Sequence, residues 1–168
     1  SLGWGVQSWT LAAMVALGEL PPVDFMVHAD TTWEHEATVD FARQWTPWLG
    51  EHGQNVVQVQ SPRAAAVQGW NGDSISVQAP VFTISSAGEQ GQLRRQCTQQ
   101  WKITPIRQFV SRELVAHGLK KTPGVVKMAM GISIDEWSRI RDSDVKYIEH
   151  EYPLVDARIS RRECSEWL

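Results

Sequence analysis

Apolar and polar residues follow the spacing of helices and strands over the first third of the chain. Apolar residues recur at helical spacing within residues 11–20, which predicts a short helix that ends before Pro21. Residues 23–29 form an apolar run of strand length. Residues 34–49 return to helical spacing, and Pro47 is expected to kink that helix or to end it early.

The middle of the chain divides into a strand, a long segment without periodicity and a helix. Residues 55–60 alternate enough to predict a strand. Residues 61–95 are rich in Gln, Gly and Ser and keep no period, and a loop of that length is usually functional or disordered. A helix is expected after it, with Thr104 as the N-cap, Pro105 at the first helical position and Gly118 as the stop.

The last third of the chain is predicted to hold two strands and two short helices. Residues 125–132 form the best candidate for a buried strand, residues 145–148 form a last strand, and a short helix or loop begins at Asp135. Residues 160–163 form a capping box that starts a final helix. This alternation predicts the α/β class, with a doubly wound, mostly parallel sheet and helices on both faces, in a single domain over residues 1–168.

Composition and charge narrow the function classes. The chain carries 16 Lys and Arg against 19 Asp and Glu, and a net charge of −3 provides no basic field for nucleic acid or an anionic membrane. No apolar run approaches the roughly 18 residues that cross a bilayer, so no membrane partner is expected. Two cysteines, Cys97 and Cys164, are too few for a disulfide scaffold or a zinc site of about four ligands. Since residues 1–10 lack a signal-peptide pattern, we expect a cytoplasmic protein.

A Gly-rich loop with hydroxyl groups opens the chain and leads into the first helix. Its candidate phosphate-binding residues are Ser1, Gly3, Gly5, Gln7 and Ser8. Glycines let backbone amides approach an anion closely, and the amides at a helix N-terminus carry the positive end of the dipole. The alternative interpretation is an ordinary Gly-rich turn.

Two predicted strands end in residues suited to a nucleotide. Asp30 and Thr31 follow the first strand, where a ribose or an adenine edge binds in open α/β sheets, although either residue is also a common helix cap. Gly131 lies at the end of the 125–132 strand, where it permits close approach, and Arg139 supplies another anion contact. Capping by a nearby Ser or Asp is the alternative there.

A basic cluster precedes the Thr104 helix. Its cations are Arg94, Arg95, Lys102 and Arg107, and Cys97 lies among them. Guanidinium groups bind phosphate or sulfate bidentately, and neighbouring cations lower the pKa of a thiol. In an acidic chain this local positive charge favours an anion site over the alternative, a solvated basic face with a buried thiol.

The order of these motifs resembles the PP-loop adenine-nucleotide hydrolase-like superfamily, and within it the phosphoadenosine phosphosulfate (PAPS) reductase family. The resemblance covers essentially the whole chain. Residues 5–8 fill the second half of the family's Ser-Gly-Gly-x-Asp-Ser motif, with Trp4 at the first Gly and Gln7 at the Asp. Cys97, Lys102, Pro105 and Ile106 match a second block of the family, in which Thr98 takes the place of the second Cys and Trp101 that of the Arg. The other matches are Asp30-Thr31, the pair Gly131 and Arg139, and Tyr152-Pro153-Leu154.

The resemblance implies that the chain binds an adenine nucleotide, which is PAPS, adenylyl sulfate or ATP. It implies reduction of an adenylyl sulfate to sulfite by a Cys thiolate, with an external, thioredoxin-like thiol reductant, and it allows a homo-oligomer. The family's first strand would precede Ser1 near the middle of the sheet, and its nucleophilic Cys would follow Leu168, so the chain is expected to be a fragment truncated at both ends. In iron-sulfur members a [4Fe–4S] cluster is bound, and Cys97 and Cys164 would be its ligands here.

Two other functions remain open. The first is an ATP-dependent PP-loop enzyme that adenylates or transfers sulfur in nucleic-acid modification, which would make nucleic acid a partner. Gln7 counts against it, because Gln lacks the carboxylate that such an enzyme would use near Mg²⁺. The second is a non-catalytic nucleotide-binding module.

Overall fold

The computed structural model describes residues 1–32, 34–61, 82–84, 88, 90–92 and 98–168, and over these residues the chain is a mixed α/β protein. In chain order its elements are α1 (Val6–Ala16), β1 (Met26–Asp30), α2 (Glu36–Glu51), β2 (Val56–Gln60), β3 (Phe82–Ile84), β4 (Gln90–Gln92), the π-helix η2 (Thr98–Ile103), α4 (Thr104–Ala116), β5 (Val126–Ala129), the 3-10 helix η3 (Ile134–Arg139), β6 (Ile148–Glu151), α5 (Pro153–Asp156) and α6 (Arg161–Trp167). Among the described residues no helix is both long and apolar enough to span a membrane.

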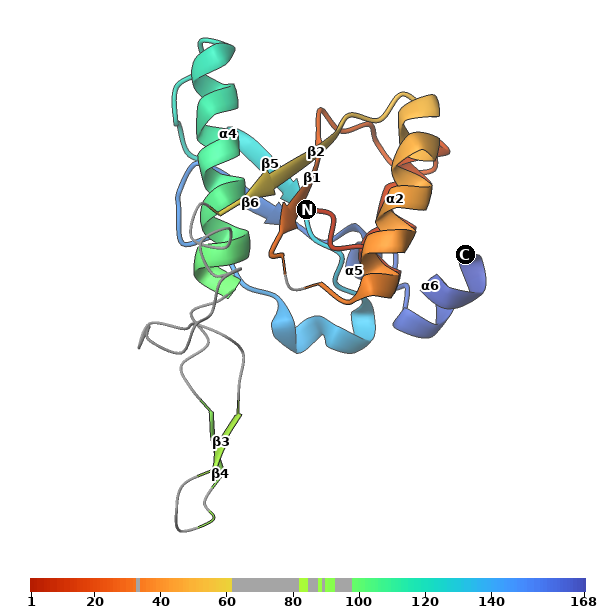
Figure 1. Cartoon of the computed structure of the whole chain (residues 1–168). Helices are drawn as coiled ribbons and strands as arrows, with labels where there is room; N and C mark the ends of the chain where they lie inside the picture. Colours follow the sequence, from red (N-terminus) through yellow and green to blue (C-terminus); the bar gives the residue numbers. More distant parts are fainter. Residues whose placement is uncertain (33, 62–81, 85–87, 89, 93–97) are drawn as a thin grey trace.

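The strands form three pairs. Strands β1 and β2 are parallel, with Met26 opposite Val56, and β5 and β6 are parallel, with Val126 opposite Ile148. Strands β3 and β4 form an antiparallel pair that lies apart from the other four in Figure 1. The α/β class is therefore confirmed, with parallel pairing in the body of the protein.

The first two residues connect the two parallel pairs. The Ser1 amine donates to the carbonyl of Ala129 in β5 at 2.9 Å, and the Leu2 amide donates to the carbonyl of Val27 in β1 at 2.8 Å. Figure 1 accordingly places the N-terminus beside β1 and close to β5 and β6. The chain therefore enters α1 from a position between the two pairs.

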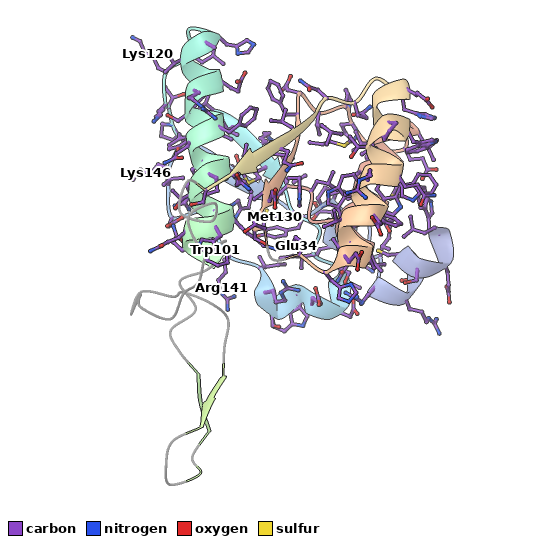
Figure 2. All side chains as sticks on the ribbon, viewed as in Figure 1. Glu34, Trp101, Lys120, Met130, Arg141 and Lys146 are labelled. Carbon is purple, nitrogen blue, oxygen red and sulfur yellow. The ribbon has the colours of Figure 1, made fainter. Side chains whose placement is uncertain are left out.

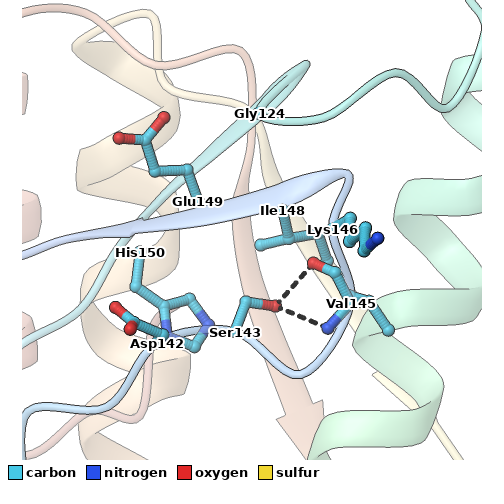
Figure 3. A pocket seen from close by; sticks show the side chains of 8 residues that line it. All are labelled: Gly124, Asp142, Ser143, Val145, Lys146, Ile148, Glu149 and His150. Carbon is cyan, nitrogen blue, oxygen red and sulfur yellow. Dashed lines mark hydrogen bonds between the residues drawn. The ribbon is translucent and has the colours of Figure 1, made fainter.

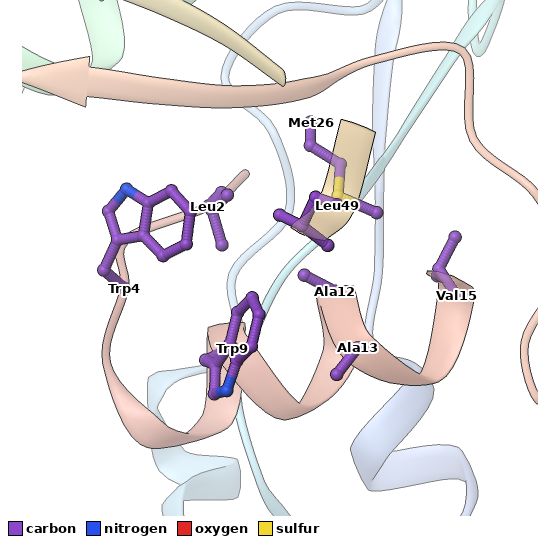
Figure 4. Close-up of a cluster of buried hydrophobic side chains, with 8 residues drawn as sticks. All are labelled: Leu2, Trp4, Trp9, Ala12, Ala13, Val15, Met26 and Leu49. Carbon is purple, nitrogen blue, oxygen red and sulfur yellow. The ribbon is translucent and has the colours of Figure 1, made fainter. Parts of the chain in front are cut away.

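Helices pack on both faces of the β1–β2 pair because successive strand side chains point to opposite faces. On one face Met26 packs with Trp9 and Ala12 of α1 and with Leu49 of α2, which is fully buried (Figure 4). On the other face the buried side chains are Val27, Ala29, Val59, Ile106 and Phe109, the last two from α4. A third cluster joins Leu11 of α1 to Leu154 of α5 and Cys164 of α6.

Two helix predictions need correction. Helix α1 begins at Val6, because Gly5 adopts the extended backbone of an N-cap, so Gln7 and Ser8 belong to the helix and not to the loop. Helix α2 continues through Pro47 to Glu51. A proline inside a helix costs about 3 kcal/mol, and the packing of Trp45, Trp48 and Leu49 against the α1 side of the core offsets that cost.

The start of α4 also differs from the prediction. Thr104 is not an N-cap, because η2 precedes it directly and the Thr104 hydroxyl donates to the carbonyl of Gln99 at 2.8 Å. The predicted stop is correct, since Gly118 adopts a φ of +67° just after the helix. The expected last strand lies three residues later than predicted, at Ile148–Glu151, and the capping box of Ser160 is confirmed at the start of α6.

Candidate functional site

The Gly-rich loop leads directly into the N-terminus of α1. The Ser8 hydroxyl donates to the carbonyl of Gly5 at 3.1 Å and accepts from the amide of Gly3 at 3.2 Å, so the loop closes on the first turn of the helix. Trp4 adopts a left-handed backbone with a φ of +58° while its side chain is buried. That conformation costs about 1–2 kcal/mol for a residue with a Cβ, and stacking of its ring on Trp9, with centroids 5.7 Å apart, offsets the cost.

Gly131 fits against the same turn. A Cβ on Gly131 would lie 2.7 Å from both the Cα and the amide nitrogen of Ser8, closer than nonbonded atoms approach. The segment after β5 therefore contacts the backbone of α1 directly, and Gly is required for that contact. The structure thus brings together two motifs that are 123 positions apart in the sequence, as residues 8 and 131 show.

Gln7 is buried in a polar network that joins three helices. Its side-chain nitrogen donates to the Ser133 hydroxyl at 3.2 Å and to a carboxylate oxygen of Glu136 in η3 at 2.9 Å. Its side-chain oxygen accepts from the guanidinium of Arg161 in α6 at 2.7 Å. Arg139 forms an ion pair with the same Glu136 oxygen at 2.6 Å. Arg139, which was predicted to bind an anion, therefore joins this network through its ion pair with Glu136.

Asp30, the last residue of β1, and Thr31, which follows it, form a second cluster. The Asp30 carboxylate accepts from the amide of Thr32 at 2.7 Å and from the side-chain amide of Gln58 at 2.8 Å. The buried Thr31 donates its hydroxyl to Glu34 at 3.0 Å. Lys102, in η2, forms an ion pair with the same Glu34 oxygen at 3.1 Å. This cluster therefore links β1 to the helix that precedes α4, and Figure 2 shows Glu34 beyond the end of β1.

Sequence reasoning missed three members of these clusters, namely Glu34, Glu136 and Arg161. Glu136 and Arg161 lie on short helices, where the sequence gives no period that would mark them as inward-facing. Glu34 was expected to begin a helix and instead precedes α2, which begins at Glu36. The predicted ligands Arg94, Arg95 and Cys97 lie outside the described residues. Of the predicted ligands in the described part, the structure groups the loop with Gly131 and Arg139, and separately groups Asp30 and Thr31 with Lys102.

The described surface includes a larger and a smaller hollow. The larger, about 630 Å³, lies between the β1–β2 pair and α2. The smaller, about 350 Å³, lies beside the turns that precede β5 and β6, and Gly124 and Lys146 line it. Figure 3 shows Glu149 and His150 of β6 on its walls. The larger hollow contains Asp30 and Trp4, so it adjoins the candidate site, whereas the smaller contains none of the predicted site residues.

Cys164 is packed as a core residue. Its side chain is fully buried against Leu11 and Leu154, and burial raises the pKa of the thiol. Among the described residues no three His, Cys, Asp or Glu side chains are grouped as metal ligands are. These surroundings of Cys164 do not fit a ligand of an iron-sulfur cluster.

The buried thiol makes stability depend on pH. Because the folded protein keeps the Cys164 proton above the ordinary pKa of 9.0, the stabilisation is present below pH 9 and is lost as the pH rises further. We expect the difference in unfolding free energy between the native chain and Cys164→Ala to shrink above pH 9, measured by urea titration at pH 7 to 10.5. An unchanged difference would show that the thiol has the same pKa in both states.

Comparison with known proteins found no matching family model, no similar curated protein and no similar solved structure.

Proposed function

We propose that this chain is an adenine-nucleotide-binding domain of the PP-loop type, similar to PAPS reductases, in which a doubly wound sheet carries the nucleotide at the carboxyl ends of its strands. The sulfate or phosphates would lie against the loop of residues 1–8, and Asp30 and Thr31 would hold the nucleoside. The proposed reaction is reduction of an adenylyl sulfate to sulfite, in the cytoplasm, at the expense of an external thiol.

The contact between Gly131 and Ser8 carries this proposal. It combines two glycine motifs at one helix N-terminus, and the residues that lead into this helix, Ser1 and Leu2, hydrogen-bond to the two parallel strand pairs. Helix N-termini bind anions through free amides and the helix dipole, and ligands in open α/β sheets bind beyond the carboxyl ends of strands. The loop, the Gly131 segment and the end of β1 together meet both conditions.

The paired cations fit an anion that arrives from solution. The side chain of Lys102 is 47% exposed and that of Arg139 is 64% exposed, although each has a carboxylate partner. Because the cations are the exposed members of these pairs, a phosphate oxygen could contact either one from solvent without displacing Glu34 or Glu136. The pairs hold both cations in place before the ligand binds.

In the proposed reaction a thiolate attacks the sulfur of the adenylyl sulfate. A bond forms between the two sulfur atoms, the bond from that sulfur to the phosphate oxygen breaks, and the nucleotide leaves with the electron pair. A second thiol then releases sulfite and leaves a disulfide, so two thiols are oxidised for each sulfate reduced. The buried Cys164 is unsuited to the attack, because burial keeps its thiol protonated, so the described residues bind and orient the nucleotide.

One observation favours the ATP-dependent alternative. Glu136 places a carboxylate 2.9 Å from the side chain of Gln7, the position at which the resembling family carries Asp. A carboxylate there is the kind of group that binds Mg²⁺ next to a phosphate. This function comes second because the Glu136 carboxylate is already paired with Arg139.

Calorimetry on the purified chain separates the two functions. We expect adenylyl sulfate or PAPS to bind without Mg²⁺ and ATP to remain intact in its presence. Release of AMP and pyrophosphate from ATP would support the alternative enzyme. Absence of binding by all three nucleotides would contradict both.

Lys102→Ala tests the phosphate contact. We expect about 10- to 150-fold weaker binding of adenylyl sulfate, because loss of one charge-assisted contact costs about 1.5–3 kcal/mol, and nearly unchanged binding of adenosine. The matched control is Lys120→Ala at the far end of α4 (Figure 2), which should change neither affinity. Equal weakening of both ligands by Lys102→Ala would contradict a phosphate role.

A further inference from the structure

Four tryptophans, which we call the tryptophan row, lie in contact with one another through the core. Trp4, in the loop before α1, stacks on Trp9 of α1 with ring centroids 5.7 Å apart. Trp9 also contacts Trp45 and Trp48 of α2, with centroids 5.3 Å and 5.9 Å away. The rings of Trp45 and Trp48 are 5.9 Å apart. Aromatic rings at these separations are in direct contact, so the row is continuous from Trp4 to Trp48.

The two ends of the tryptophan row differ in their exposure. Trp4 and Trp9 are buried, whereas Trp45 and Trp48 are only partly buried. His52, which is exposed, packs on the ring of Trp48 with centroids 4.1 Å apart. The row therefore starts at the Gly-rich loop, where Trp4 lines the larger hollow, and ends at the surface near the end of α2.

Packing alone does not account for the indole of Trp4. Phe41 lies in the same cluster, edge-on to Trp4 and Trp9, so a phenyl ring also packs here. The indole nitrogen of Trp4 is buried without a hydrogen-bond partner among the described residues. A buried donor without a partner destabilises the folded state, and phenylalanine at this position would supply apolar area without that cost. The chemistry of the indole is therefore a better explanation than its size.

The indole group differs from a phenyl ring in its ease of oxidation. It loses one electron more readily, and rings in contact exchange an electron. An oxidised indole carries a positive charge, which is more stable near water than in an apolar core, so a missing electron at Trp4 is passed outwards to Trp48. His52 favours that end further. Its Nδ1 donates to the carbonyl of Trp48 at 2.8 Å, which leaves Nε2 of the neutral ring to accept a proton.

We propose that the tryptophan row carries oxidising equivalents, one electron at a time, from Trp4 to the surface at Trp48 and so protects the candidate site. A one-electron oxidant such as the carbonate radical anion takes an electron from Trp4 and leaves as carbonate. Trp4 recovers the electron from Trp9, and Trp9 recovers it from the indoles of α2. The oxidised Trp48 releases its N–H proton, and ascorbate in solution then returns one hydrogen atom to it. This relay goes beyond the proposed nucleotide chemistry and does not depend on it.

Oxidation by photolytically generated carbonate radicals tests the relay, with tandem mass spectrometry to locate the oxygen added to each tryptophan. Trp48→Phe removes the outlet of the row, so oxidation of the buried Trp4 should rise several-fold over the native chain. Trp48→Tyr keeps a side chain that can be oxidised, and it should restore the low level. The matched control is Trp137→Phe, which removes an indole that is 67% exposed and lies outside the row, on η3. It should leave the oxidation of Trp4 unchanged.

A second interruption lies within the row. Trp9→Phe removes the indole that contacts Trp4, and it should raise the oxidation of Trp4 in the same way as Trp48→Phe does. Circular dichroism and urea titration verify that each variant folds. Because the two interruptions lie on different helices, α1 and α2, the test does not depend on the folding of a single variant.

Three results would overturn the inference. One is equal oxidation of Trp4 in the native chain, Trp48→Phe and Trp9→Phe. Another is an equal rise in Trp48→Phe and Trp48→Tyr, which would mean that either substitution merely opens the core. The third is an equal rise in Trp137→Phe, which would mean that exposed indoles simply consume the oxidant. Because no nucleotide is present, failure of the relay leaves the proposed function intact, and failure of nucleotide binding leaves the relay intact.

Discussion

Replacement of Gly131 by alanine is expected to lower the free energy of unfolding by about 3 kcal/mol, at the upper end of the range for overpacking. The new Cβ would lie 2.7 Å from two backbone atoms of Ser8 in the first turn of α1, and backbone atoms cannot move aside as a flexible side chain does. Either the segment after β5 or the start of α1 must shift. Denaturant titration measures the loss, and nucleotide affinity should fall with it, because the displaced turn belongs to the proposed phosphate site.

Gly50→Ala is the matched control for this experiment. Gly50 lies inside α2, and a Cβ there meets no atom within 4 Å. The same change should therefore raise stability by about 0.5 kcal/mol, because alanine favours the helix. Similar effects of the two substitutions would show that Gly131 does not contact Ser8 as described.

Gln7→Glu is expected to destabilise the chain by about 3 kcal/mol at pH 8. The substitution keeps the shape of the side chain but replaces a donor by a carboxylate oxygen 2.9 Å from the carboxylate of Glu136. Two carboxylates at that distance cannot both ionise without a large penalty, so one of them must take up a proton. The loss should diminish as the pH falls towards 5, which urea titrations across that range would measure.

The double variant Gln7→Glu with Glu136→Gln restores the pairing in the opposite sense. The amide at position 136 would then donate to the carboxylate at position 7, and Arg161 would face that carboxylate directly. We expect most of the lost stability to return, with a small cost at the exposed Arg139, whose partner is removed. Gln99→Glu at an exposed position should have little effect. Additive losses in the double variant would mean that the two side chains do not interact.

The sequence predicts the order and type of the elements well where local chemistry decides them. Gly118 and the capping box at Ser160 are examples, because the left-handed backbone and the reciprocal hydrogen bonds need only neighbouring residues. Pro47 shows the limit. Its local penalty predicts a kink or an early end, but the partial burial of Trp45 and Trp48 on either side of it, which depends on α1, lets the helix continue to Glu51.

The sequence predicts the glycines of the candidate site but not the residues with which its polar side chains interact. Gly131 could be singled out because a glycine at a strand end indicates close approach. The partners of Gln7 could not, because Glu136 and Arg161 come from short helices, η3 and α6, whose positions depend on packing against α5 and α1. Lys102 was identified as a cation, but its ion pair with Glu34 depends on the fold around β1.

The hydrogen bonds of Ser1 and Leu2 to β5 and β1 determine which end of this chain is suited to a tag or a label. Any tag, linker or fluorophore joined to the Ser1 amine starts between the two strand pairs, 2.9 Å from the carbonyl of Ala129. Leu168, at the other terminus, is 51% exposed and follows a helix at the surface. Immobilisation and labelling should therefore use the C-terminal end, which leaves the hydrogen bonds of Ser1 and Leu2 to the two parallel strand pairs undisturbed.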